Sequence, residues 1–125
     1  FKSNIFNLGN NEERISGVIN HTKMLTLCVS KGTIGVILDL KSKDLIPDLK
    51  NLIIYDTPED AHLTLATQVG FEIFSFTDLI NEGYKIMDQK KDEPNSDSIL
   101  ILGVTSGTTG EPKLAMLSHL NFISG

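Results

Sequence analysis

The sequence predicts an α/β fold in which parallel strands are joined by crossover helices. Short apolar segments at residues 25–30, 51–55 and 72–76 alternate with segments whose apolar residues recur at helical spacing. A Thr-Pro-Glu-Asp sequence at residues 57–60 is typical of the start of a helix. The order strand, helix, strand, helix favours parallel strands, because a parallel pair needs a long connection between its members.

The first expected element is an amphipathic helix. Asn10 or Asn11 can cap its N-terminus, and Glu12 and Glu13 lie in its first turn, where negative charge is favourable. Its inner face is expected at Ile15, Val18, Ile19 and Thr22.

A buried strand is expected at residues 25–30, because this segment is short, apolar and followed by Gly32. The single cysteine of the chain, Cys28, falls within it and is interpreted as a reduced, buried thiol, so neither a disulfide framework nor a cysteine metal cluster is predicted. Residues 33–40 are ambiguous: their β-branched side chains favour a strand, whereas their length favours a helix, which we prefer. Apolar positions consistent with that helix are Ile37, Leu38 and Leu45.

Residues 51–55 predict a second buried strand, and the next helix is expected to begin with Thr57 as its cap and Pro58 at its first position. Gly70 is expected to end this helix in the left-handed conformation. The expected inner face consists of Ala61, Leu65, Ala66 and Val69.

A third strand is expected at residues 72–76, and a short helix closed by Gly83 at residues 77–82. Residues 88–98 are polar and lack a hydrophobic period, which predicts a surface linker. Residues 99–104 are apolar again and predict a strand that leads directly into a loop rich in glycine and hydroxyl residues.

This loop, residues 105–113, reads Thr-Ser-Gly-Thr-Thr-Gly-Glu-Pro-Lys. Gly107 and Gly110 allow backbone N–H groups to converge on a phosphate chain without interference from side chains. Lys113 brings a positive charge, and Pro112 stiffens its approach. Hydroxyl groups able to donate to phosphate oxygens or to contact a hydrated magnesium ion are those of Thr105, Ser106, Thr108 and Thr109.

The loop differs from the usual nucleotide P-loop, because Glu111 and Pro112 stand between the second glycine and the lysine. A GTPase or motor ATPase is therefore not predicted. A surface hairpin without a ligand remains the alternative interpretation of the loop.

Residues 105–113 resemble, residue for residue, the signature loop of the adenylate-forming (AMP-binding) superfamily of acyl-CoA synthetases, luciferases and peptide-synthetase adenylation domains. Upstream, residues 18–21, 52–56 and 70–76 are similar, more loosely, to eukaryotic long-chain acyl-CoA synthetases. Residues 116–119 look like the family's return strand and helix entry. The resemblance thus implies a β-hairpin with the phosphate-binding loop at its tip, and a helix that begins near Leu120.

The resemblance also implies that residues 1–125 are an internal fragment of the large N-terminal domain of such an enzyme. They would form part of a single AMP-binding domain, with residues 88–98 as a surface linker within it. Leu114 stands where the family usually has a glycine after the lysine, and a positive φ at this position would strain the loop by about 1 kcal/mol or more.

The activity implied by the resemblance is that of an ATP-dependent long-chain fatty acid–CoA ligase, which forms an acyl-adenylate and then a thioester. Fatty acid, ATP, Mg²⁺ and coenzyme A are the implied substrates and cofactors. No catalytic residue and no certain metal ligand are expected within this segment, which is predicted to be inactive alone. Alternatives are another adenylate-forming carboxylate ligase or a non-catalytic nucleotide-binding relative. By resemblance, the ATP phosphates would be held by Thr105, Ser106, Gly107, Thr108, Thr109, Gly110 and Lys113.

Charge and hydropathy exclude two other classes of function. The net charge is −5 and no basic cluster exceeds two adjacent lysines, so a nucleic-acid surface is not predicted. No apolar run approaches the roughly 20 residues that span a bilayer. The resemblance nevertheless allows membrane association of the full protein, at the cytoplasmic face of the endoplasmic reticulum or of another organelle membrane.

The histidines are interpreted as structural residues. His21 and His62 fall on predicted helices and are expected to face solvent or to cap, and His119 is expected to lie at a helix entry. None has a partner at the spacing of a metal site.

Overall fold

A computed structural model of the chain describes residues 11–89, 92–105 and 113–125. The chain divides into two compact units, of which one is formed by Asn10–Asp88 and the other includes Gln89–Gly125.

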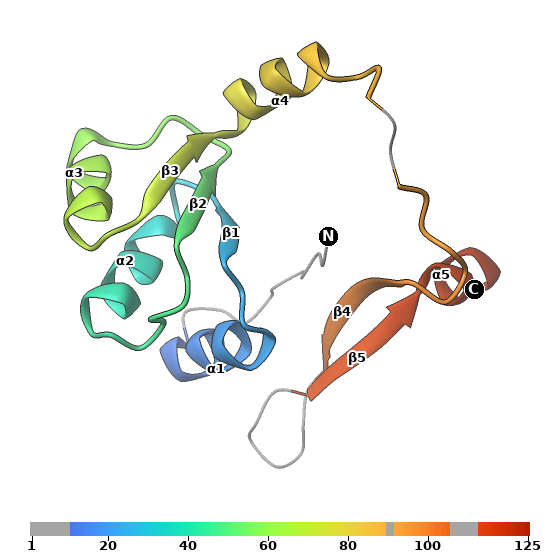
Figure 1. Ribbon diagram of the computed structural model, residues 1–125. Coiled ribbons are helices and arrows are strands. Elements are labelled where there is room, and N and C mark those ends of the chain that lie inside the picture. The colour runs from blue at the N-terminus through green and yellow to red at the C-terminus, as the bar shows by residue number, and fades with distance from the viewer. Residues whose placement is uncertain (1–10, 90–91, 106–112) are drawn as a thin grey trace. The chain divides into compact units, whose positions relative to one another are not determined.

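The first unit is built on a three-stranded parallel sheet with the strand order β1-β2-β3 (Figure 1). The strands are β1 (Thr26–Val29), β2 (Asn51–Ile54) and β3 (Glu72–Ser75). Helices connect consecutive strands, as the crossover of a parallel pair requires. The predicted α/β fold with parallel strands is confirmed.

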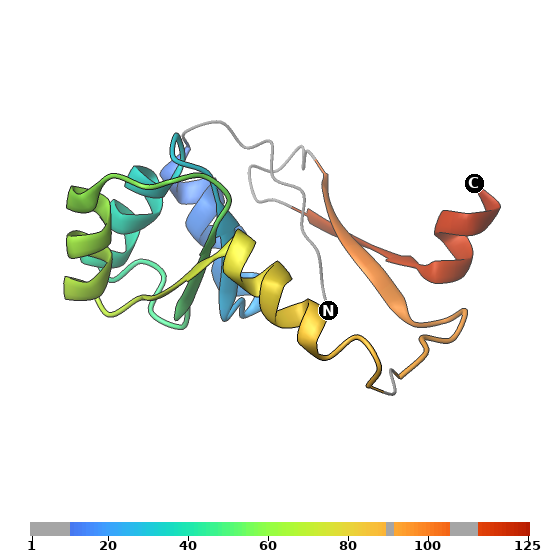
Figure 2. The ribbon, with the colours of Figure 1, turned by 90° about the horizontal axis from the view of Figure 1, so that it is seen from above.

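The two crossover helices, α2 (Ile34–Ser42) and α3 (Asp60–Gln68), lie on the same face of the sheet (Figures 1 and 2). The core lies beneath them, where Leu52 is fully buried and Leu27 and Val29 point inward. The helical interpretation of residues 33–40 is confirmed. The fully buried residues of α2 and of the loop that follows it are Ile34, Leu38, Leu40, Ile46 and Leu49.

Helix α1 (Glu12–Thr22) is capped by Asn11, whose Oδ1 accepts a hydrogen bond from the Arg14 backbone N–H at 3.0 Å. Of the two predicted caps, Asn11 is therefore the one used. The helix buries Val18 and Ile19, as the helical spacing predicted. An ion pair of 3.0 Å between Lys43 Nζ and Glu12 Oε2 ties it to the end of α2.

The prediction of a buried Cys28 is wrong. Burial alternates along β1, so that Leu27 and Val29 are buried while Thr26 and Cys28 are exposed. The alternation follows from the helices α2 and α3, which cover one face of the sheet, and Cys28 belongs to the other face.

The predicted bounds of α3 are wrong at its N-terminus. Glu59, in an extended conformation, is the N-cap, and the helix begins at Asp60, so Pro58 precedes the helix. The fixed φ of proline suits an extended residue as well as the first helical turn. Leu65, predicted to face inward, is 40% exposed. Gly70 has a φ of +85°, which confirms the left-handed conformation after this helix.

Helix α4 (Phe76–Lys85) also differs from its prediction. It begins directly after β3, with the Ser75 hydroxyl accepting a hydrogen bond from the Asp78 backbone N–H at 3.3 Å, and it continues through Gly83. A glycine inside a helix costs only about 1 kcal/mol, so it does not by itself end one.

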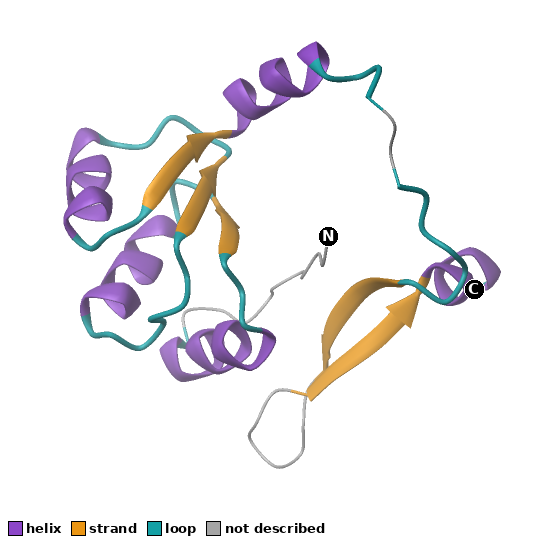
Figure 3. Ribbon diagram, viewed as in Figure 1, coloured by secondary structure: helices purple, strands orange, loops and turns teal. Residues whose placement is uncertain are grey.

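The second unit contains an antiparallel hairpin of β4 (Ile99–Thr105) and β5 (Lys113–Ser118), followed by α5 (His119–Ser124) (Figure 3). The predicted hairpin is confirmed. Ser118 and Asn121 cap α5 reciprocally, because each side chain accepts a hydrogen bond from the other's backbone N–H. The helix thus starts one residue before the predicted Leu120.

The described residues of the predicted linker, 88–89 and 92–98, are exposed apart from the half-buried Ser98. The assignment of residues 1–125 to a single domain remains a prediction. Within the described ranges, every helix is too short or too polar to cross a membrane.

Candidate functional site

The hairpin brings together the two ends of the predicted phosphate-binding loop. Thr105 is the last residue of β4, Lys113 is the first residue of β5, and the two are partners in the strand register. The other predicted site residues lie outside the described residues: Ser106, Gly107, Thr108, Thr109 and Gly110.

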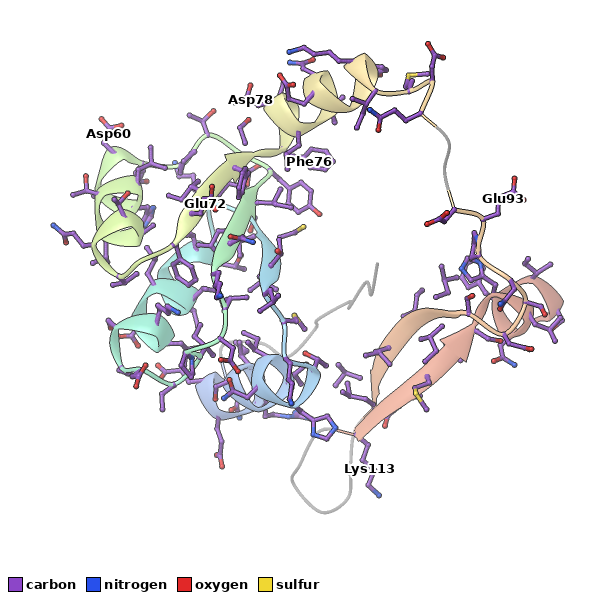
Figure 4. All side chains as sticks on the ribbon, viewed as in Figure 1. Asp60, Glu72, Phe76, Asp78, Glu93 and Lys113 are labelled. Carbon is purple, nitrogen blue, oxygen red and sulfur yellow. The ribbon has the colours of Figure 1, made fainter. Side chains whose placement is uncertain are left out.

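A hydrogen bond joins the two residues at the base of the loop, Thr105 and Lys113, which together form the neck of the loop. Thr105 Oγ1 donates to the Lys113 carbonyl oxygen at 3.3 Å, and both residues are exposed. Opposite residues of an antiparallel pair carry their side chains on the same face, so the Thr105 hydroxyl and the Lys113 ammonium share one face of the hairpin. Figure 4 shows the Lys113 side chain extending from the start of β5.

Leu114 does not strain the neck. It lies in β5 opposite Val104, and the described non-glycine residues with positive φ are Lys23 and Asp44. The strain considered for Leu114 is therefore not present, because an extended strand accepts leucine without cost.

The exposed groups at this end of the hairpin suit an anion. The ion pairs formed among the described residues involve Lys31, Lys43 and Lys85, and none of them involves Lys113. Within the described part of the chain, no three His, Cys, Asp or Glu residues cluster as metal ligands. The Lys113 ammonium therefore fits a phosphate chain, whereas the described residues by themselves do not make a magnesium site.

The sequence did not predict a cavity of about 330 Å³ in the first unit, at the carboxyl ends of β2 and β3. The predicted parallel topology could have indicated this cavity, since ligands of α/β sheets bind at the carboxyl ends of the strands. Its wall includes Ile54, Phe74 and Asp56, and Asp56 Oδ2 accepts a hydrogen bond from the Lys31 backbone N–H at 3.0 Å. A carboxylate in the wall disfavours phosphate, so the hairpin remains the better candidate.

The histidines have no catalytic arrangement among the described residues. His21 is exposed on α1, as predicted, and His119 is the first residue of α5, which confirms the predicted helix entry. His62 was predicted to face solvent or to cap. It is instead half-buried on α3, and its buried Nδ1 atom has no hydrogen-bond partner among the described residues.

Comparison with known families decides what kind of protein carries this hairpin. The family described as "AMP-binding enzyme" matches residues 4–125, almost the whole chain. The chain belongs to the AMP-binding enzyme family. The predicted resemblance to adenylate-forming enzymes is thus confirmed.

Relatives within the AMP-binding family include acyl-CoA ligases. Over 113 residues the chain is 34% identical to long-chain-fatty-acid–CoA ligase 5 of Rattus norvegicus, a match that covers 90% of this chain and 16% of the relative. It is 27% identical to fatty acyl-CoA synthetase B of Dictyostelium discoideum over 113 residues, with the same shares of both chains. The chain thus spans about 16% of the length of these relatives.

Solved adenylation domains of carboxylate reductases have the same fold as this chain. The adenylation domain of a carboxylate reductase from Mycobacterium chelonae aligns with a TM-score of 0.73 at 22% identity, covering 94% of this chain and 20% of that one. The corresponding domain from Segniliparus rugosus, in complex with AMP and a carboxylic acid, aligns with a TM-score of 0.73 at 17% identity and covers 97% and 20%. At these identities the likeness establishes the fold alone.

Proposed function

We propose that the protein containing this chain is an ATP-dependent ligase that converts long-chain fatty acids into CoA thioesters, and that this chain supplies the phosphate-binding loop. The observation that carries the proposal is the sequence Thr-Ser-Gly-Thr-Thr-Gly-Glu-Pro-Lys, which begins at the last residue of β4 and ends at the first residue of β5. The names of relatives 34% and 27% identical support the fatty acid substrate.

In the proposed reaction a carboxylate oxygen of the fatty acid attacks the α-phosphorus of ATP. The bond from that phosphorus to the bridging oxygen breaks, and pyrophosphate leaves. The thiol of coenzyme A then attacks the acyl carbonyl carbon, loses its proton, and displaces AMP.

Lys113 would act on the first of these steps. Negative charge grows on the departing pyrophosphate, and a fixed ammonium at the end of the loop stabilises it more in the transition state than in bound ATP. The glycines of the loop would present backbone N–H groups to the same oxygens. None of these groups is a nucleophile or a general base, so their part is binding and orientation.

Magnesium is proposed to arrive with ATP and to neutralise part of the phosphate charge. The described residues of the predicted loop are Thr105 and Lys113, and of these two only Thr105 has an oxygen-bearing side chain that could approach such an ion. Membrane association at an organelle surface stays a prediction from the resemblance.

Carboxylate-dependent exchange between ATP and labelled pyrophosphate tests the proposal in the full protein. Palmitate is expected to support exchange well above the rate with an aryl acid such as benzoate or with an amino acid, and coenzyme A should convert the adenylate into palmitoyl-CoA. Faster exchange with benzoate or an amino acid would identify another adenylate-forming ligase. Absence of exchange with every acid would identify a non-catalytic relative.

A further inference from the structure

The hydrogen bond at the neck of the loop joins two residues eight positions apart in the sequence. Thr105 and Lys113 form the last pair of the β4–β5 ladder, beyond which the chain leaves the strands. The last pair of a ladder is the one most prone to open, because strand pairing supports it on one side only. A side-chain bond at this position therefore acts where the hairpin is weakest.

The Thr105 hydroxyl has a single proton to donate. In the structure the hydroxyl oxygen lies 3.3 Å from the Lys113 carbonyl oxygen, to which it donates this proton. While it does so, the hydroxyl can accept a hydrogen bond but cannot donate one to a phosphate oxygen. This geometry separates Thr105 from the phosphate-donating role that its place in the loop sequence predicts.

We infer that Thr105 is a positioning residue: its side chain clasps β5 at the neck and fixes where Lys113 and the loop begin. The inference rests on the proposed function of the loop as the binder of ATP phosphates. It adds that Thr105 acts through the backbone of Lys113, rather than by direct donation to the phosphates. If Thr105 and Lys113 are already held together before ATP binds, ATP binding does not have to offset the loss of conformational entropy that ordering them would cause.

Two substitutions of Thr105 in the full protein isolate the clasp. Thr105→Val keeps the β-branched shape suited to a strand but has no hydroxyl, and Thr105→Ser keeps the hydroxyl. Loss of one such hydrogen bond predicts a KM for ATP about three- to tenfold higher in Thr105→Val. The KM for palmitate should be unchanged, and Thr105→Ser should restore the KM for ATP.

Hydrogen exchange without ATP distinguishes a clasp from a phosphate contact. Thr105→Val should speed exchange at the Val104 and Leu114 amides in the ATP-free protein, and Thr105→Ser should not. If Thr105→Val weakens ATP binding while these amides exchange at the wild-type rate, Thr105 contacts the phosphates directly and the inference is wrong. A wild-type KM for ATP in Thr105→Val would equally overturn it.

Lys113→Ala provides the reference for the proposed function itself. This substitution removes the ammonium but keeps the carbonyl that accepts the clasp, so exchange at Val104 and Leu114 should stay at the wild-type rate. An unchanged rate of acyl-adenylate formation in Lys113→Ala would contradict the loop assignment. If only the inference about Thr105 is wrong, Lys113→Ala will slow adenylate formation, whereas Thr105→Val will have the wild-type KM for ATP and the wild-type rate of amide exchange.

Discussion

Lys41 shows how a single charged side chain can organise a loop. Its Nζ atom donates to the carbonyl oxygens of Leu49 at 2.7 Å and Pro47 at 2.8 Å, with a longer contact of 3.4 Å to Ile46, and lies 5.3 Å from the centre of the Phe71 ring. The ammonium has three protons, and three carbonyls surround it. It thereby holds the segment that leads from α2 to β2.

Lys41→Met should keep the aliphatic stem and lose these contacts. We expect the free energy of unfolding of the full protein to fall by about 1–3 kcal/mol, because hydrogen bonds from a charged donor contribute this much. Urea denaturation measures the change. Lys50→Met is the matched control: Lys50 is exposed, and its side chain forms no hydrogen bond or ion pair among the described residues. A loss of the same size in Lys50→Met would show that the effect is not specific to the carbonyl contacts.

Tyr55 and Cys28 form a second residue-scale feature, on the side of the sheet that carries exposed Cys28. The Cys28 side chain raises the pKa of the Tyr55 hydroxyl above its ordinary value of 10.0, first as a hydrogen-bond partner and second through the negative charge of its thiolate, with a small contribution from burial. The Tyr55 ring also lies 4.8 Å from that of Phe76, which Figure 4 labels at the start of α4.

Cys28→Ala should lower the pKa of Tyr55 towards its ordinary value, as measured by NMR titration of labelled tyrosine Cζ. A raised folded-state pKa favours the neutral phenol in the folded protein. The resulting stability is complete below the unfolded pKa of tyrosine and is lost as pH rises through the higher folded value. Wild type and Cys28→Ala should therefore differ in the slope of stability against pH only above about pH 10. An unchanged Tyr55 titration would rule out the thiol as the cause.

The sequence predicted single-residue features correctly where they depend only on residues nearby in the chain. The cap at Asn11 was one of two predicted candidates, because a cap depends on neighbours three residues away. The exposure of Cys28 was not predictable in this way. An apolar run does not reveal how many faces of a strand are covered, and that depends on where the crossover helices pack.

Substitution by alanine is expected to change stability in opposite directions at Gly70 and Gly35. Gly70 follows α3 with a φ of +85°, whereas Gly35 lies in the first turn of α2 at a negative φ, and no heavy atom would meet an added Cβ within 4 Å at either position. Side-chain clashes are thus absent in both cases, and only the backbone conformation differs.

Gly70→Ala should destabilise the protein by about 1–2 kcal/mol, because alanine is strained in the left-handed region. Gly35→Ala should stabilise it by up to about 1 kcal/mol, because alanine favours a helix. Thermal unfolding of the two variants measures both effects. Changes of the same sign would contradict this explanation of how α3 ends.

The bounds of the helices show the limit of local signals. Thr57 and Pro58 were predicted to start α3, but the helix begins at Asp60, and Gly83 was predicted to end a helix that continues to Lys85. Both residues are compatible with two local structures, and packing against the sheet decides between them. The order of the elements was predictable because it depends on the hydrophobic pattern of whole segments.

For the whole molecule, the loop sequence was the strongest predictor of family, because its residues are contiguous. The hairpin that carries the loop was less predictable. The pairing of Thr105 with Lys113 and the extended conformation of Leu114 follow from the register of β4 and β5. A register is set by the turn and the two strands together, so the sequence of the loop does not fix it. The substrate, by contrast, is proposed from relatives of which this chain spans about 16%.

Lys113 and its loop are proposed to bind the phosphates of ATP in an adenylate-forming ligase. Lys113→Ala in the full protein tests this claim most directly, with both half-reactions measured. We predict that formation of the acyl-adenylate from ATP and palmitate falls by roughly a hundredfold or more, the scale of losing one transition-state contact. Formation of the thioester from supplied palmitoyl-adenylate and coenzyme A should change little, because no pyrophosphate leaves in that step. Equal losses in the two half-reactions, or no loss in the first, would contradict the claim.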